Sequence, residues 1–315
     1  MSNTRFLHQR LEASPFWRQV GWQLDSRQSG DVRLRLPYSE ANTTAATALH
    51  GGVIAATLDV AGSLAAWSAG GNSNDAFVGR TLSCDVSYIA GALGEDIFGE
   101  ATVLRRGKEI IYSSVQAKSR EGKVLASGNH IFHIGLPGTV PPAPPAPDVV
   151  DANYVPQGNS DQGLGHLPSR QPDIVAANLR MLERMDGRMP YMDQLCWRFM
   201  RGDFGFAEYL LPARGIALGE DRGVAGGALL SAVDHAGSLA AWMTTRLGDR
   251  KLFGSTVNTK LQTIATPIDR DVRVQARALG GTGDLIGSVV SIITEAGEAV
   301  ASGSTMYRII ERTGD

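Results

Sequence analysis

Two stretches of the chain share one pattern: residues 51–67 read GGVIAATLDVAGSLAAW, and residues 226–242 read GGALLSAVDHAGSLAAW. Each begins with two glycines, ends in AGSLAAW and contains no proline, lysine or arginine. Because apolar residues occupy all sides of such a segment at the helical period, each stretch predicts a fully buried helix. Each also carries one aspartate, Asp59 or Asp234, although burial of an unpaired carboxylate is unfavourable. These two aspartates are therefore candidate functional residues.

The two stretches belong to a longer internal repeat with a constant offset of 175 residues. At this offset Trp22 matches Trp197, and Ala126-Ser127-Gly128 matches Ala301-Ser302-Gly303. Two copies of this length are too few and too long for a solenoid, whose repeats have about 20–50 residues. The chain is therefore predicted to contain two homologous domains.

A proline-rich segment separates the copies and includes the run PPAPPAP at 141–147. Such a run favours extended structure and cannot join the interior of a helix or a sheet. We therefore expect a first domain at 1–135, a linker at 136–172 and a second domain at 173–315.

Segments with strand periodicity follow each predicted helix. In the first copy Leu82, Cys84, Val86 and Tyr88 alternate with polar residues, which predicts a strand with one covered face. Glycine-containing turns join four such segments as hairpins, after a single strand that precedes the helix. This order predicts an α+β fold in which an antiparallel sheet curls around a central buried helix, once in each copy.

Composition excludes several classes of protein. The 315 residues are 43% hydrophobic and 20% charged, with a net charge of −2, which gives no field to attract nucleic acid or an anionic membrane. The first thirty residues have no apolar core of signal-peptide length, and no uninterrupted apolar run approaches eighteen residues. Cys84 and Cys196 have neither metal-site nor disulfide spacing. We expect a cytoplasmic protein without a metal, a nucleic-acid partner or a membrane span.

The order of elements, together with the motif His50-Gly51-Gly52-(x)6-Asp59, resembles the hotdog-fold acyl-CoA thioesterases of the phenylacetate-associated (PaaI-like) group. The resemblance covers both copies, so the chain resembles a tandem double hotdog. The second copy retains Gly226, Gly227 and Asp234, but Ala225 replaces the histidine. Members of the family usually carry an asparagine closer to the histidine than Asn42 is here.

The resemblance implies hydrolysis of an acyl-CoA thioester, with coenzyme A as part of the substrate and no separate cofactor. It also implies an intrachain pseudo-dimer, which could dimerise further, with sites at the interface of the two repeats. Each aspartate is expected to face the other repeat, so that Asp234 pairs with His50 and Gly52, and Asp59 pairs with Gly227.

The physical chemistry of a helix start agrees with these roles. The first amides of a helix have no partner within it, and the helix dipole favours negative charge there. A thioester carbonyl can approach because glycine has no side chain, so we expect an amide, first of all that of Gly52, to hold the oxyanion. Gly51 and Gly226 are expected to contact substrate. The aspartate would act as a general base for water or as a nucleophile that forms a mixed anhydride, and the sequence does not separate these.

Other candidate residues keep two interpretations. Ser63 and Ser238 either fix a carboxylate or a helix carbonyl, or contact the substrate water. His50 either orients the carbonyl or holds the loop. For Asn42 a turn role is favoured over substrate binding, and for Arg105 and Arg106 a solvated hairpin tip is favoured over contact with the CoA phosphates.

His130 and His133 are three residues apart on a strand and are therefore expected on opposite faces, which excludes a metal site made by the pair. Two alternative functions remain open. A hotdog enoyl-CoA hydratase or dehydratase is suggested only by His235, which follows Asp234. A non-catalytic acyl-CoA-binding module is suggested by Ala225. The sequence does not identify the acyl group or show whether both sites work.

Overall fold

A computed structural model describes residues 3–44, 47–69, 78–135, 172–185, 189–245, 252–264, 268–282 and 284–311. The predicted linker lies outside these residues, except that its last residue, Pro172, begins a helix. The domain boundaries predicted within that segment stay a prediction.

The two repeats contain the same elements in the same order. The first has α1 (Asn3–Ala13), α2 (Pro15–Val20), β1 (Gln23–Gln28), β2 (Asp31–Leu36), the short 3-10 helix η1 (Glu40–Asn42), α3 (Gly51–Ala69), β3 (Val78–Tyr88), β4 (Ile97–Arg106), β5 (Ile110–Ser119) and β6 (Val124–Gly135). The second has α4 (Pro172–Met185), α5 (Pro190–Gln194), β7 (Arg198–Asp203), β8 (Phe206–Leu211), η2 (Gly215–Ala217), α6 (Gly226–Trp242), β9 (Leu252–Thr263), β10 (Val272–Thr282), β11 (Leu285–Thr294) and β12 (Ala299–Glu311).

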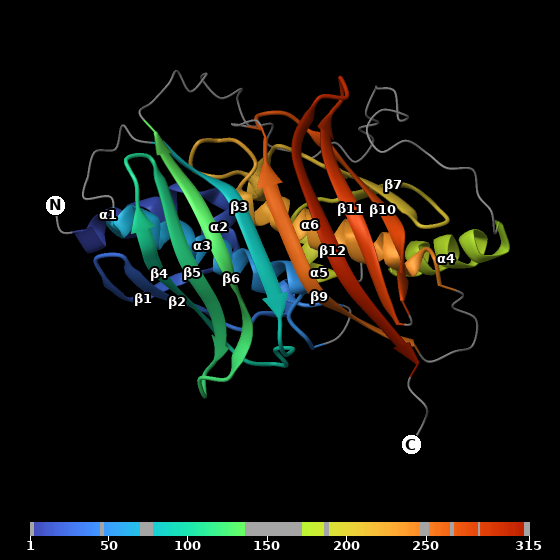
Figure 1. Cartoon of the computed structure of the whole chain (residues 1–315), viewed down its shortest axis with the longest axis horizontal. Helices are drawn as coiled ribbons and strands as arrows, with labels where there is room; N and C mark the ends of the chain where they lie inside the picture. The colour runs from blue at the N-terminus through green and yellow to red at the C-terminus, as the bar shows by residue number, and fades with distance from the viewer. Residues whose placement is uncertain are drawn as a thin grey trace.

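All twelve strands form one antiparallel sheet with the order β1-β2-β4-β5-β6-β3-β9-β12-β11-β10-β8-β7. The repeats join where β3 pairs with β9, with Ser83 opposite Gln262 and Ser87 opposite Asn258. The central helices α3 and α6 lie behind this sheet and contact each other (Figure 1). The predicted α+β fold of two tandem hotdog domains is confirmed.

The central helix α3 is buried along nearly its whole length, since every residue from Gly52 to Ser68 is inaccessible to solvent. By length and composition alone it could cross a membrane, but 94% of its most apolar window is covered by the rest of the protein. Its apolar character is therefore that of a core helix.

One strand per repeat was missed from the sequence. A hairpin precedes each central helix, β1-β2 in the first repeat and β7-β8 in the second, where a single strand was predicted. Gly30 and Gly205 reverse the chain with φ angles of +84° and +64°, which glycine adopts readily. No residue of β1 is buried, so the alternation by which a half-buried strand is identified is absent there.

A β-bulge changes which residues of β3 face the helices. The pairing with β6 shifts between Thr81 and Ser83, so Leu82 has no direct partner. Thr81 and Cys84 are consequently both buried, whereas Leu82 was predicted to share the inner face. The pairing of β9 with β12 shifts at the equivalent place, between Thr256 and Asn258. Each repeat thus turns a threonine toward the central helices.

The short lead-in helices are exchanged between the repeats. The amide of Phe16, in α2, donates to the carbonyl of Leu218 beside η2, at 3.0 Å. Conversely, the amide of Tyr191, in α5, donates to the carbonyl of Thr43 beside η1, at 3.4 Å. Each lead-in helix therefore covers the approach to the other repeat's central helix, and the two repeats interlock.

We predict that Gly128→Ala destabilises the fold, because a Cβ there would lie 1.8 Å from the backbone oxygen of Asp85 on the paired strand. Overpacking typically costs about 1–3 kcal/mol, and a backbone neighbour cannot rotate away, so a loss at or above this range is expected in urea unfolding. Gly91→Ala is the matched control, since no heavy atom lies within 4 Å of its added Cβ. Equal midpoints for the two variants would contradict this account of the β3–β6 contact.

Candidate active site

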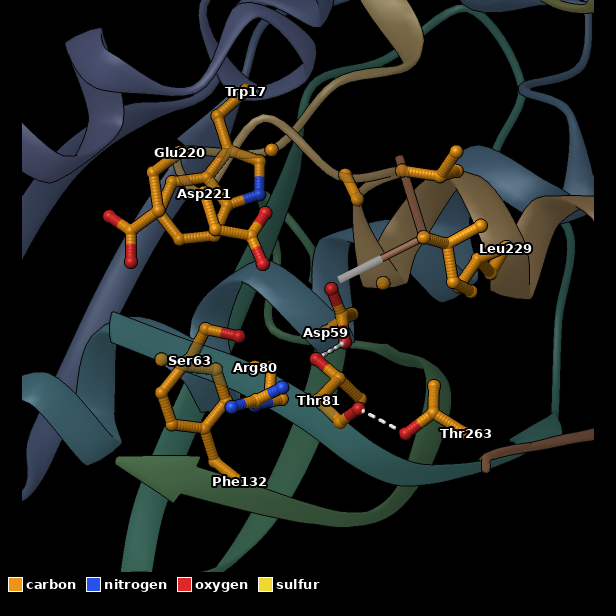
Figure 2. A pocket seen from close by; sticks show the side chains of 16 residues that line it. Trp17, Asp59, Ser63, Arg80, Thr81, Phe132, Glu220, Asp221, Leu229 and Thr263 are labelled. Carbon is orange, nitrogen blue, oxygen red and sulfur yellow. Dashed lines mark hydrogen bonds between the residues drawn. The ribbon is translucent and has the colours of Figure 1, made fainter. Parts of the chain in front are cut away.

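The carboxylate of Asp59 lies in the middle of α3 and is almost fully buried. Its Oδ1 accepts a hydrogen bond of 2.6 Å from Thr81 Oγ1 (Figure 2). The same oxygen lies 3.2 Å from Nε2 of His130, on β6. Both recorded contacts go to Oδ1, and among the residues that the structure describes no hydrogen bond is recorded for Oδ2. The carboxylate is thus held by one oxygen only.

Asp59 faces the start of the other repeat's helix. A Cβ added to Gly226 would lie 3.1 Å from Asp59 Oδ1 and 2.6 Å from Thr81 Oγ1. The second pair has the same arrangement, since a Cβ added to Gly51 would lie 2.8 Å from Asp234 Oδ2. Each aspartate therefore lies beside a glycine of the opposite repeat, in the crossed arrangement that the family resemblance led us to expect.

The second glycine of each pair does not face the carboxylate. The amide of Gly52 donates to His50 Nδ1 at 2.9 Å, and a Cβ on Gly52 would lie 2.8 Å from the Ser231 Cβ. A Cβ on Gly227 would meet Phe16 and Ala56. Gly52, predicted as the oxyanion donor, therefore has another partner for its amide, and the first glycines, Gly51 and Gly226, lie nearer the carboxylates.

Asp234 has a different set of partners from Asp59. Its Oδ1 accepts from Thr256 Oγ1 at 2.8 Å and from Thr259 Oγ1 at 3.2 Å. Burial raises the pKa of Asp234 to about 6, opposed by the hydrogen bonds from the two threonines and from Tyr88. The hydroxyl of Tyr88 also donates to the Gly51 carbonyl at 3.0 Å.

His50 makes the kind of contact expected from its loop-holding interpretation, since Nδ1 accepts a hydrogen bond from the Gly52 amide. Burial, reinforced by the neighbouring His235, lowers the pKa of His50 to about 3, so the ring is neutral and Nδ1 can accept the Gly52 amide. The ring centroids of Tyr191 and His235 lie 5.3 and 5.6 Å from that of His50. Burial also lowers the pKa of His235 to about 4. Both imidazoles are therefore uncharged at neutral pH.

A cavity of about 50 Å³ opens beside Asp59 (Figure 2). It is lined by residues of both repeats: Trp17, Asp59, Ser63, Gly79, Arg80, Thr81, Phe132, Gly219, Glu220, Asp221, Val224, Ala225, Gly226, Leu229, Thr263 and Ile268. One water needs about 10–15 Å³ of such space, so the cavity has room for a water beside the carboxylate.

Two further carboxyl groups line this cavity, on the loop before α6. Burial raises the pKa of Glu220 to about 7, although the guanidinium of Arg10, at 3.1 Å, opposes the shift. Burial also raises the pKa of Asp221, opposed by the Gly223 amide and by Arg80. The cavity therefore combines an apolar wall with Glu220, whose carboxyl is partly protonated near neutral pH, and with Asp221, whose pKa burial raises.

The remaining predicted residues lie in different places. Ser63 lines the cavity, but Ser238 donates to the backbone carbonyl of Asp234 at 2.7 Å. Asn42 is buried, and its side-chain amide donates to the Val20 carbonyl at 3.1 Å, which is a structural role. Arg105 and Arg106 are exposed at the end of β4 and are not among the residues that line the cavity.

Two residues that contact Asp59 were missed from the sequence. Thr81 was hidden by the bulge, which moves it onto the inner face. His130 was considered only as a partner of His133. The two side chains lie on opposite faces of β6: His130 is fully buried, whereas Nε2 of His133 lies 3.5 Å from Oε2 of the exposed Glu109. A polar residue at an inward position of a strand that packs on an aspartate-bearing helix is the sequence feature that could have identified His130.

We predict that Asp234→Asn stabilises the protein above pH 6. A folded-state pKa raised from 3.8 to about 6 means that the native state binds more protons than the unfolded chain, so wild-type stability falls as the pH rises through this window. The amide Oδ1 still accepts from the threonines without ionising. We expect the variant to be more stable at pH 7.5 by about 2–3 kcal/mol, with the difference disappearing below pH 4. Chemical unfolding at pH 4, 6 and 7.5 measures it, and a difference independent of pH would contradict the raised pKa of Asp234.

Known proteins resemble the chain in sequence and in structure. A family model described as the thioesterase superfamily matches residues 47–126. Human acyl-coenzyme A thioesterase 13 is 32% identical over 114 residues, which are 36% of this chain and 79% of that protein. A putative esterase from Saccharolobus solfataricus is 29% identical over 107 residues, which are 34% of this chain and 74% of that protein.

Solved structures match over nearly the whole chain. A hot dog fold protein of unknown function from Alicyclobacillus acidocaldarius has a TM-score of 0.57 at 16% identity, over 91% of this chain and 96% of that one. Acyl-CoA thioesterase II TesB2 from Mycobacterium marinum has a TM-score of 0.53 at 13% identity, over 93% and 98% of the respective chains. At these identities the structures establish the fold, a double hotdog that covers both repeats.

Proposed function

We propose that this chain, which belongs to the thioesterase superfamily and is a thioester hydrolase, cleaves acyl-CoA at the interface of its two repeats, in the cavity beside Asp59 and Gly226. One observation carries this proposal. A buried carboxylate of the first repeat lies against the side-chain-free start of the second repeat's helix, and both line a cavity large enough for water.

Polarisation of the thioester carbonyl is assigned to the start of α6. Amides in the first turn of a helix have no intrahelical partner, and the positive end of the dipole favours an oxygen that gains negative charge. Because Gly226 has no side chain, Asp59 and Thr81 lie directly against the helix start, and the carbonyl would approach from the cavity that Gly226 lines. Amide donors of this kind stabilise a tetrahedral oxyanion more than the ground-state carbonyl.

Asp59 is assigned the activation of water. As water adds to the carbonyl carbon, its proton passes to Asp59 Oδ2, and the carbonyl oxygen becomes the oxyanion held by the helix start. Collapse of this intermediate breaks the C–S bond, and the departing sulfur of coenzyme A takes the proton. The products are a free acid and coenzyme A. The alternative, attack by Asp59 itself through a mixed anhydride, uses the same contacts.

Thr81 and His130 are positioning residues in this scheme. Both contact Oδ1 of Asp59, at 2.6 and 3.2 Å, which directs Oδ2 away from them. In the second repeat Thr305 takes the place of His130, and it donates to the Val233 carbonyl rather than to Asp234. The Asp59 half therefore has a histidine contact to its carboxylate that the Asp234 half lacks.

We predict that Asp59→Asn lowers the release of free thiol from acyl-CoA by about 100-fold or more, since removal of a general base typically costs 10²–10⁴-fold. Release is measured with a thiol-reactive chromophore over short, medium, long and aryl acyl-CoA substrates. Glu121→Gln, in an exposed turn, is the matched control and should retain wild-type turnover.

Two results would contradict the proposal. Hydration of an enoyl-CoA without thiol release would indicate the hydratase alternative. Full turnover by Asp59→Asn would move the chemistry away from this cavity. A single turnover in ¹⁸O-water tests the nucleophilic role of Asp59, because label in the Asp59 carboxylate requires a mixed anhydride that water opens at the aspartyl carbon.

A further inference from the structure

The two halves of the pseudo-dimer differ at one strand position that lies against the candidate sites. At the repeat offset Tyr88, the last residue of β3, corresponds to Thr263, the last residue of β9. Their registers are equivalent, since Tyr88 pairs with Ala126 and Thr263 pairs with Ala301. The difference is therefore one of side chain and not of backbone position.

The larger side chain is bonded at the helix start that would receive substrate. The Tyr88 hydroxyl donates to the carbonyl of Gly51 at 3.0 Å, and a Cβ added to Gly51 would lie 2.8 Å from Asp234 Oδ2. In the other half the hydroxyl of Thr263, on β9, donates to the Thr81 carbonyl of the neighbouring strand β3 at 2.7 Å. Thr263 consequently lines the cavity beside Asp59 without closing it.

Two further differences between the repeats place larger side chains in the Asp234 half. Tyr191 replaces Phe16 and forms a 2.9 Å contact with Ser231 through its hydroxyl. His50 replaces Ala225, and its ring lies against those of Tyr191 and His235. At these two positions the Asp234 half thus has larger side chains than the Asp59 half.

We infer that Tyr88 closes the Asp234 half, so that the chain has one substrate site, at Asp59, and that the residue at the end of β3 or β9 determines which half admits acyl-CoA. The inference rests on the proposed function for the identity of the ligand. A thioester carbonyl and its water must reach the carboxylate and the helix start, and in the Asp234 half the phenol hydroxyl is already bonded at that helix start, 3.0 Å from the Gly51 carbonyl.

Binding stoichiometry tests the inference independently of turnover. A non-hydrolysable thioether analogue of acyl-CoA is titrated calorimetrically into the full chain. We expect one molecule per wild-type chain and two per Tyr88→Thr chain. Tyr88→Phe is the matched control, because it keeps the ring and should still bind one. Two molecules per wild-type chain, or one per Tyr88→Thr chain that unfolds at the wild-type temperature, would overturn the inference.

Turnover gives a second test that shows which half works. In the Asp59→Asn background, Tyr88→Thr should raise thiol release at least about tenfold, and adding Asp234→Asn should abolish that gain. Thr263→Tyr alone should lower wild-type release to the level of Asp59→Asn. Loss of wild-type activity by Asp234→Asn with retention by Asp59→Asn would overturn the inference. Absence of thiol release from the wild type would instead contradict the proposed function, while the stoichiometry would still decide whether Tyr88 closes a site.

Discussion

The direct contact between the two central helices is the constraint on which the site depends. Gly52 packs against Ser231 of α6, and Gly227 packs against Ala56 of α3, each without space for a Cβ. This close approach brings the first glycine of each helix to the aspartate of the other. The pairing of β3 with β9 holds the helices in this relation, because it makes one sheet of the two repeats. Neither repeat contains both the helix start and the carboxylate that faces it.

Burial of the aspartates is unfavourable for the fold, and each half offsets it differently. Asp59 is contacted by Thr81 and His130, whereas Asp234 is hydrogen-bonded by two threonines and a tyrosine. Hydrogen bonds to a buried charge recover part of the desolvation cost and also fix its orientation. In the first repeat one carboxylate oxygen remains beside the cavity, and in the second the phenol takes that position. Similar helices therefore support two chemically different environments.

The sequence was sufficient for the repeat and the buried helices, because these depend on a constant offset and on local composition, whereas the crossed pairing of aspartates and glycines was expected only from the family resemblance. The sequence was insufficient for the contacts that depend on how distant strands and helices pack together. The bulge at Leu82 shifts the alternation by one residue and brings Thr81 to Asp59. The sequence motif indicated His50 and Ala225 as the difference between the halves. It did not indicate Tyr88 and Thr263, because residues at strand ends have no pattern that identifies them as site residues. The exchange of α2 and α5 depends on contacts between residues far apart in the chain, such as Phe16 with Leu218.

That exchange has a consequence for synthesis of the protein. The first repeat leaves the ribosome before the second, and domains generally begin to fold in this order. Phe16, fully buried in the finished protein, packs at Gly227 and bonds to Leu218, about 200 residues later in the chain. Until those residues are made, the apolar side of α2 has no surface to cover it. The first repeat therefore completes its fold only after the second has been translated at least to the start of α6.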